Sequence, residues 1–337
     1  MKHHIPKVFV LLIAFLITKK AYSQEGYLST LSFTKADSLV KTYPNHLTSI
    51  DNLAYRIQND FTSQQEQLRA AFTWIATHIM YDLNDYYSLR PPKRIYYTSK
   101  EERRRKLKKA QDQLAATTLT TKKGLCESYA SMAKVLCNRL KFPAVIINGY
   151  TKMDTRLIGT TPGIKNHAWN AVYLNERGHL LDATWAAGDE TEYRKTWSFR
   201  FNDHYFLEDP SHFITHHFPE DPNWQLLEVP VSKAVFFKTP IFYEAYYEMD
   251  VTLSASHNGT LILNPKTRTL FVYFDSKPDS PLFFLTHSTI EPTKIKLKKT
   301  NSGYVGKCKI KDPNPRFLTI FKDQKAILDF KIEIQQN

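Results

Sequence analysis

The pattern of apolar residues changes near Val235, and this change constrains the fold more than any other feature. Upstream, apolar residues recur every three or four positions, which is the period of an amphipathic helix. Downstream, short β-rich runs alternate with Asn-Gly, Pro and Asp-Pro turns. The runs cover residues 245–253, 260–263, 270–274, 282–286, 294–297, 304–310, 317–321 and 327–334. The sequence therefore predicts an α+β protein whose residues 236–337 form a β-sandwich of Ig-like type.

The amino-acid composition argues against several classes of protein. The chain has 337 residues, which is enough for about two domains. Hydrophobic residues make up 42% and charged residues 23%, and these globular values argue against a disordered or coiled-coil chain. Ten glycines are few for a Gly-rich nucleotide-binding scaffold, and three cysteines exclude a disulfide framework.

Residues 1–23 have the pattern of a secretory signal peptide. An apolar run at 8–18 follows a basic start, and Ala21-Tyr22-Ser23 supplies small residues before a cut at Gln24. A membrane anchor through residues 8–18 is the alternative, but eleven apolar residues are too few to span a bilayer as a helix. We therefore expect a secreted or periplasmic protein with no transmembrane span in the mature chain. Cleavage would lower the net charge from +13 to +9, because four lysines and no acid are removed.

Three helices are predicted upstream of Val235, at residues 50–61, 68–79 and 125–140. Residues 83–121, between the second and third helix, lack the helical period and form an insertion that is either a loop or an exposed helix. Its basic run, Lys100 to Lys109, holds seven basic and two acidic residues. We expect a solvated face there, with binding to a cell-envelope polymer as the alternative. No nucleic acid is expected, because the run has no interleaved aromatic residues.

Three residues suit nucleophilic catalysis. Cys126 lies in the first turn of the third predicted helix, where backbone N–H groups and the helix dipole favour a thiolate. His167 opens a predicted strand at 167–174, and an imidazole can take the thiol proton and return it to a leaving group. Asp182 lies on the next predicted strand, 179–185, where a carboxylate would orient the imidazole.

The register of the hairpin that carries His167 and Asp182 stays open. A four-residue turn at 175–178 puts the two side chains on one face of the sheet, but about 13 Å apart. A tighter turn at Leu174-Asn175 would place them directly opposite each other, and a bulge is a further way to bring them together.

The residues around these positions resemble three sequence blocks of the transglutaminase-like superfamily. The blocks are Gly124–Ala130, Asn166–Asn170 and Leu181–Trp185. Residues 69–75 and 79–82 also resemble the helix before the core, and residues 204–227 resemble the segment after it in the kyphoscoliosis-peptidase-like branch. The resemblance covers about residues 45–235. It implies a papain-like α+β core in a catalytic domain at 24–235 of an exported bacterial member.

The resemblance implies that Cys126, His167 and Asp182 carry acyl transfer on peptide or amide bonds. Water as the acceptor makes the chain a cysteine peptidase or amidase, and an amine makes it a crosslinking transglutaminase. We favour hydrolysis because the similar branch is peptidase-like. The alternative is a catalytically degenerate scaffold or binding protein of the cell envelope. Ser128 stands where many members carry Gly, which bears on substrate fit rather than on the triad.

No cofactor and no bound metal are expected. His212, His216 and His217 include an i, i+4 pair, but Pro210 and Pro219 bracket them, so we expect a surface loop rather than a metal site. Cys137 is expected in the core, with a disulfide to Cys308 as the alternative in an oxidising compartment. Trp169 and Trp185 are expected to pack around the site.

Overall fold

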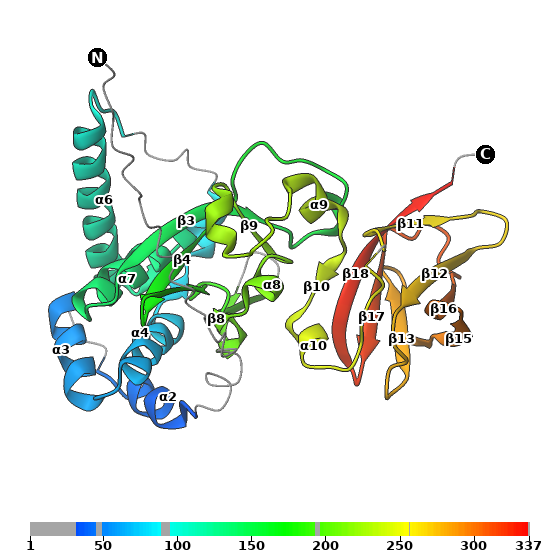
Figure 1. Ribbon diagram of the computed structural model, residues 1–337, viewed down its shortest axis with the longest axis horizontal. Helices are drawn as coiled ribbons and strands as arrows, with labels where there is room; N and C mark the ends of the chain where they lie inside the picture. The colour runs from blue at the N-terminus through cyan, green and yellow to red at the C-terminus, as the bar shows by residue number, and fades with distance from the viewer. Residues whose placement is uncertain (1–31, 45–48, 89–94, 193–195, 256, 336–337) are drawn as a thin grey trace, which may run out of the picture. The chain divides into compact units, whose positions relative to one another are not determined.

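The computed structural model describes residues 32–44, 49–88, 95–192, 196–255 and 257–335 (Figure 1). The predicted signal peptide lies outside these ranges. From Phe33 onward the chain forms one compact unit. Within the ranges described, no helix combines the length and the apolar character needed to cross a membrane.

Helices come first along the chain. The α-helices of the described ranges are α2 (Thr34–Lys41), α3 (Ile50–Asp60), α4 (Gln64–His78), α5 (Leu83–Tyr87), α6 (Lys100–Thr121), α7 (Cys126–Arg139), α8 (Pro210–Phe213), α9 (Lys233–Lys238) and α10 (Glu244–Tyr247). Short 3-10 helices are η1 (Thr155–Leu157), η2 (Asp203–Tyr205) and η3 (Pro222–Gln225). The helices predicted at 50–61, 68–79 and 125–140 are confirmed as α3, α4 and α7.

Helix α4 forms the centre of the N-terminal core. Ser63 and Glu66 begin it with a capping box: the Ser63 hydroxyl accepts from the Glu66 N–H at 3.2 Å and donates to its carboxylate at 2.8 Å. Every residue from Leu68 to Ala76 is buried. Helices α2, α3 and α7 pack around it, so α4 supports the helix that begins with Cys126.

Arg69 of α4 is a buried cation. Its side chain is 3% exposed and donates two hydrogen bonds to Asp37 of α2, at 2.8 and 2.7 Å. Three phenylalanine rings lie 5.0–5.2 Å from its guanidinium group: Phe33, Phe201 and Phe206. The paired charge and the surrounding rings join α2 to α4.

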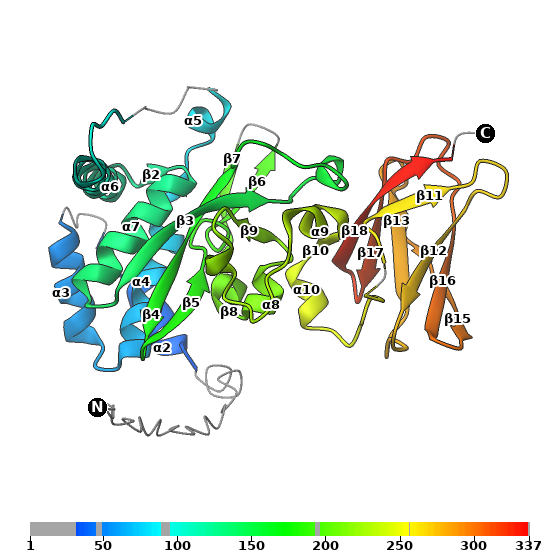
Figure 2. The ribbon, with the colours of Figure 1, turned by 45° about the horizontal axis from the view of Figure 1, so that its top comes forward.

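A five-stranded antiparallel sheet follows the helices, in the order β8–β5–β4–β3–β9. Its strands are β3 (Ala144–Thr151), β4 (His167–Leu174), β5 (Arg177–Leu181), β8 (Phe206–Glu208) and β9 (His217–Pro219). Helix α7 packs on β3 and β4 (Figure 2). Asn170 fixes this contact, because its amide donates to the carbonyls of Ala130 on α7 and Val145 on β3, both at 3.0 Å. The strand predicted at 167–174 is confirmed as β4.

The turn between β4 and β5 is shorter than the predicted four residues. Only Asn175 and Glu176 form it, with φ of 50° and 63°, as a type I′ turn requires. Leu174 therefore pairs with Arg177, and Asn170 pairs with Leu181. Neither predicted register is correct, and no bulge interrupts the pairing of β4 with β5.

The strand predicted at 179–185 is wrong beyond Leu181, where β5 ends. Asp182 follows the strand instead of lying on it, and a turn at 183–187 comes next. The Asp182 carboxylate accepts hydrogen bonds from the N–H groups of Thr184 and Trp185, at 2.7 and 3.2 Å. Such side-chain bonds to the backbone compete with strand pairing and end the strand here.

The C-terminal part is a β-sandwich, as predicted. One sheet has the order β10–β18–β17–β13–β14, with β11 pairing in parallel with β18, and the other has the order β12–β16–β15. The strands are β10 (Ile241–Phe242), β11 (Thr260–Leu263), β12 (Thr269–Phe274), β13 (Leu282–Thr286), β14 (Thr293–Lys294), β15 (Lys296–Thr300), β16 (Gly303–Lys309), β17 (Phe317–Lys322) and β18 (Lys325–Ile334). Val272, Phe284 and Phe330, from both sheets, share one buried core.

The strand predicted at 245–253 is wrong. Residues Glu244–Tyr247 form the short helix α10, and Leu253 makes only an isolated bridge to Phe274. The Tyr246 hydroxyl accepts a hydrogen bond from the Leu253 N–H at 2.8 Å. This backbone N–H is therefore satisfied by a side chain instead of by the carbonyl of a neighbouring strand. Helix α9 spans the predicted boundary near Val235.

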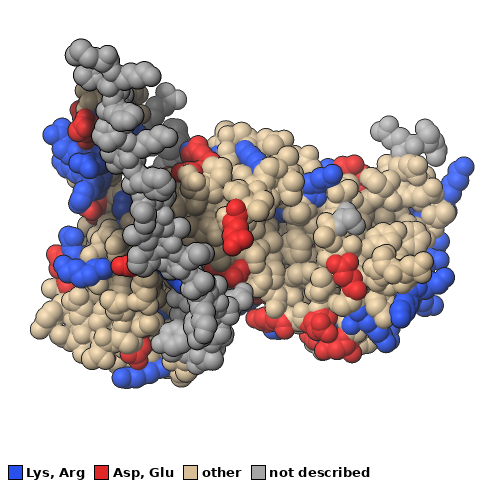
Figure 3. Space-filling model, in the orientation of Figure 1, with Lys and Arg blue, Asp and Glu red and all other residues tan. Residues whose placement is uncertain are grey.

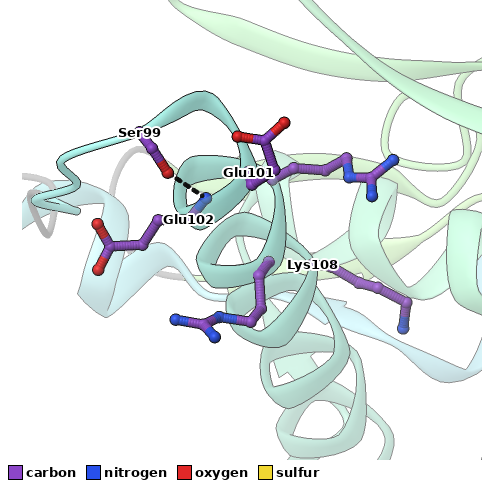
Figure 4. A pocket seen from close by; sticks show the side chains of 6 residues that line it. Ser99, Glu101, Glu102 and Lys108 are labelled. Carbon is purple, nitrogen blue, oxygen red and sulfur yellow. Dashed lines mark hydrogen bonds between the residues drawn. The ribbon is translucent and has the colours of Figure 1, made fainter.

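In the described part of the insertion at 83–121 the chain forms helices α5 and α6. The basic run lies on α6, so it is an exposed helix and not a loop. The short pair β1 (Met80–Tyr81) and β2 (Lys123–Gly124) brackets it. Ser99 begins α6 by accepting a hydrogen bond from the Glu102 N–H at 3.1 Å (Figure 4). The lysines and arginines between Lys100 and Lys109 are all exposed (Figure 3, upper left).

The pocket in Figure 4 lies along this charged helix. Its lining residues are Ser99, Glu101, Glu102, Arg104, Arg105 and Lys108. Because none of the three candidate catalytic residues lines it, this pocket does not locate their site.

Candidate active site

Cys126 is the first residue of α7, as predicted, and is partly exposed. The preceding residues are held by the parallel pairing of β1 with β2, in which Tyr81 lies opposite Gly124. Leu125 occupies the N-cap position without capping through its side chain. Backbone N–H groups of the first helical turn therefore lie next to the thiol, where they favour a negative charge.

Gly124 brings the chain close to α7 just before Cys126. A Cβ at this position would lie 2.2 Å from Ser128 Cβ and 2.4 Å from its hydroxyl oxygen, so only glycine fits without displacement. Ser128 is 7% exposed and packs on this backbone. Ser128 therefore contributes to the packing of α7 against the residue pair before Cys126.

His167 is held at the start of β4. The Asn166 side chain accepts from the Thr151 N–H at 2.8 Å and donates to the Thr151 carbonyl at 3.1 Å, which extends the pairing of β3 with β4. His167 Nε2 lies 2.6 Å from Asp182 Oδ2. Because Nε2 faces Asp182, Nδ1 is the nitrogen left for the Cys126 thiol, which lies near enough to His167 to raise its pKa. The structure therefore brings all three predicted residues together.

Asp182 is 1% exposed and accepts four hydrogen bonds. Its Oδ1 accepts from the two backbone N–H groups of the turn that follows β5. Its Oδ2 accepts from two imidazoles, His167 at 2.6 Å and His217 at 2.9 Å. Burial alone would raise the pKa of Asp182, but the charge of His167 and these hydrogen bonds hold it well below its usual range.

The same contacts set the charge of His167. Burial alone would lower its pKa, yet the charge and hydrogen bond of Asp182, followed by Cys126, raise it to about 10. An imidazolium is therefore the stable form beside Cys126 at neutral pH. The rings of Trp169 and Trp185 lie 6.1 and 5.9 Å from the His167 ring and pack around it.

His217 and His216 were missed by the sequence analysis, and the expected surface loop is wrong for both. They are 0% and 3% exposed. Residues Phe218 and Pro219 continue His217 as the edge strand β9, which pairs with β3. The apolar residues near His217 in the sequence could have indicated that it is buried. Three of these neighbours, Phe213, Ile214 and Phe218, are buried as well.

A second polar group lies behind His217. His216 Nε2 and His204 Nε2 lie 3.0 and 2.9 Å from Glu208 Oε1. Burial alone would raise the pKa of Glu208, but the charge of His216 and the bonds of both imidazoles lower it to about 2. Glu208 is therefore a carboxylate paired with imidazoles in the interior.

Two clusters of side chains contain residue types that bind metal ions. One consists of His167, Asp182 and His217, and the other of His204, Glu208 and His216. The nitrogen–oxygen distances in them are 2.6 to 3.0 Å. Two ligand atoms on one tetrahedral zinc, each about 2.0–2.1 Å from the ion, would lie about 3.3 Å apart. The shorter distances are those of hydrogen bonds and ion pairs between imidazoles and carboxylates.

Cys137 and Cys308 are buried free thiols. Cys137 belongs to the core around α4 and α7, as predicted, and Cys308 belongs to the core of the β-sandwich. The alternative of a disulfide between them is therefore wrong. Burial raises the pKa of each thiol to about 12, which leaves Cys126 as the accessible thiol.

Relatives of the chain are known. Kyphoscoliosis peptidases from Mus musculus and Homo sapiens are each 29% identical over 241 residues, covering 67% of this chain and 33% of theirs. Hillarin from Drosophila melanogaster is 26% identical over 157 residues, covering 42% of this chain and 19% of its own. The chain thus spans about a third of the length of the kyphoscoliosis peptidases it matches.

Among solved structures, the periplasmic domain of TgpA from Pseudomonas aeruginosa is 18% identical and covers 47% of this chain and 49% of that chain. The TM-score is 0.27, which is too low for a comparison of the two folds. Residues 51–187, which contain α3, α4, α7 and the three candidate residues, match the family model of the Transglutaminase-like superfamily. At residues 51–187 the chain therefore carries a transglutaminase-like domain.

Proposed function

We propose that this protein is a cysteine acyl-transfer enzyme that acts on peptide or amide bonds. Cys126 is the nucleophile, His167 moves the proton, and Asp182 orients His167. One observation carries the proposal: His167 is hydrogen-bonded to Asp182 through Nε2, and Cys126 lies near enough to the same ring to raise its pKa. This is the order of base and orienting carboxylate that a thiol nucleophile requires.

Each step assigns one bond change to a named group. The Cys126 thiolate attacks the carbonyl carbon, an S–C bond forms, and negative charge develops on the carbonyl oxygen. The Cys126 N–H, at the start of α7, is the proposed donor to that oxygen. As the C–N bond breaks, the His167 proton passes to the leaving amine. The acceptor then attacks the thioester, gives its proton to His167, and Cys126 leaves as the thiolate.

We favour water over an amine as the acceptor. The similar proteins from mouse and human are named peptidases, and the match to them covers 67% of this chain. An enzyme that uses water releases a carboxylic acid, whereas one that uses an amine leaves a new amide. The two outcomes differ in whether a supplied primary amine ends up in the product.

The test is turnover of a denatured protein such as casein, with and without a fluorescent primary amine. Wild-type protein should release new peptide amines and incorporate little of the fluorescent amine. Cys126→Ala should release no peptide amines and incorporate no fluorescent amine. Cys137→Ala, on the same helix, is the matched control and should retain activity because that thiol is buried. Equal activity of wild type and Cys126→Ala would exclude the mechanism. Absence of turnover in wild type would favour the degenerate scaffold.

We propose export through the signal peptide at residues 1–23, with catalysis outside the cytoplasm. The exposed basic face of α6 would then hold the enzyme to an anionic cell-envelope polymer. Replacing Arg103, Arg104 and Arg105 with Glu should reduce the salt needed to elute the protein from a heparin column. The matched control replaces three exposed lysines on edge strand β15, Lys296, Lys298 and Lys299. Equal loss in both variants would show that net charge, and not the α6 face, governs binding.

A further inference from the structure

We propose that His217 is a positioning residue that donates a hydrogen bond to the Asp182 oxygen used by His167 and so holds that carboxylate in place. The inference rests on the proposed function. His217 Nε2 lies 2.9 Å from Asp182 Oδ2, and His167 Nε2 lies 2.6 Å from the same atom. An ionised carboxylate has acceptors only, so each imidazole must present an N–H to it.

The register of the sheet places His217 beside the catalytic group. Gly149 of β3 pairs with His167 on one side and with Pro219 on the other. Residues directly opposite share a face, and His217 precedes Pro219 by two, so His217 and His167 lie on the same face. Gly149 lets β9 and Trp169 pack closely on β3, since a Cβ there would lie 2.2 Å from the Phe218 carbonyl oxygen and 2.4 Å from a ring carbon of Trp169.

Packing fixes the ring of His217. The side chain is 0% exposed, and its ring centroid lies 4.4 Å from those of Trp185 and Phe213. The titratable groups that face it from the neighbouring elements are Asp182, His167, His216 and Tyr205, with Glu208 and His204 beyond His216. This close packing of aromatic rings restricts rotation of the His217 ring.

His216 is the hydrogen-bond partner of the other nitrogen of His217. The two Nδ1 atoms are hydrogen-bonded to each other, so one proton lies between them. Burial lowers the pKa of His217 to about 3, although the hydrogen bond to Asp182 opposes this, so His217 is neutral. With hydrogen already on Nε2, its Nδ1 must accept from His216. The Glu208 carboxylate accepts from Nε2 of His216, 3.0 Å away, which orients that donor.

The arrangement has a consequence for Cys126. With His217 in place, Asp182 is held through both oxygens and remains in line with His167. Without that donor, Oδ2 keeps only the hydrogen bond to His167, and the carboxylate is held less firmly. The His167 imidazolium then loses part of its stabilisation and becomes a weaker partner for the Cys126 sulfur.

The experiment compares His217→Phe with His217→Gln. Phenylalanine fills the space of the ring without a donor, whereas the glutamine amide carries an N–H at a similar distance along the side chain. The readout is the rate of Cys126 alkylation by iodoacetamide at pH 6, followed by intact mass, with Cys126→Ala as the blank. The phenylalanine variant should react about tenfold more slowly than wild type, the effect of one pKa unit. The glutamine variant should remain within about threefold of wild type.

Nitrogen NMR of the unmodified protein tests the same inference without a substitution. Between pH 5 and 8, His217 should be the neutral tautomer with hydrogen on Nε2. A doubly protonated His217, or hydrogen on Nδ1, would overturn the inference, and so would a phenylalanine variant that reacts like wild type. If wild-type Cys126 reacts at pH 6 as an ordinary thiol, the proposed function fails, while the NMR result still decides the role of His217.

Discussion

His167 and Asp182 are joined by a 2.6 Å hydrogen bond although they are not opposite each other in the β4–β5 hairpin. The register that pairs Asn170 with Leu181 would put Asp182 opposite Trp169, two residues from His167. Diagonal neighbours at this spacing are about 7–8 Å apart between Cα atoms, within reach of an imidazole and a carboxylate. The two-residue turn is therefore what brings the pair into contact.

Replacing Glu176 with Gly should stabilise the protein. Glu176 has φ of 63°, a left-handed conformation that glycine adopts without steric cost. We expect a gain of about 0.5–1 kcal/mol in the free energy of unfolding, measured by urea denaturation. The control is Gln113→Gly on the exposed face of α6, where glycine should cost about 1 kcal/mol. Destabilisation by both substitutions would contradict the type I′ turn.

Replacing Gly124 with Ala should destabilise the protein and slow alkylation of Cys126. The new Cβ would lie 2.2 Å from Ser128 Cβ, so the start of α7 must shift. Overpacking of this kind costs about 1–3 kcal/mol. The matched control is Gly163→Ala, because no atom lies within 4 Å of a Cβ at that position. Equal stability of the two variants would show that Gly124 is not tightly packed.

Replacing Arg69 with Met should cost about 3 kcal/mol, because Asp37 keeps a charge that has lost its partner. The control is Arg139→Met, whose pair with Asp51 is 52% and 69% exposed and should contribute less than about 1 kcal/mol. Thermal and urea unfolding of both variants measure the difference. Similar losses in the two variants would mean that burial does not strengthen the Arg69 pair.

Stability should depend on pH with opposite signs for His217 and His167. The pKa of His217 falls from 6.5 to about 3 on folding, so the unfolded chain binds more protons between these values and stability rises with pH. The pKa of His167 rises from 6.5 to about 10, so its contribution is fully present below pH 6.5 and is lost as pH rises toward 10.

Two variants separate these contributions. In urea titrations from pH 4 to 10, His217→Gln should flatten the acid side of the stability profile and His167→Gln the alkaline side. If His217→Gln leaves the acid side unchanged, the buried neutral state of His217 is wrong.

The sequence predicted the parts of the fold that depend on local pattern. The period of the apolar residues predicts strand β4 and helices α3, α4 and α7. The predicted start of α7 in turn places the Cys126 thiol in the first turn of that helix. The apolar pattern did not predict where β5 ends, because Asp182 ends the strand through hydrogen bonds from its own side chain to the following turn. The burial of His216 and His217 also escaped prediction, because the nearby prolines suggest a loop and only pairing with β3 makes this segment a strand.

The central claim is that Cys126 forms a covalent acyl intermediate with the help of His167. Its most direct test is the reaction with p-nitrophenyl acetate, followed by p-nitrophenol release and by the intact mass of the protein. The account predicts a burst equal to the enzyme concentration, an acetyl group on Cys126, and further turnover as water removes it. In His167→Gln, both acylation and turnover should slow. No acetyl group on Cys126 in wild type, or an unchanged burst in Cys126→Ala, would contradict the account.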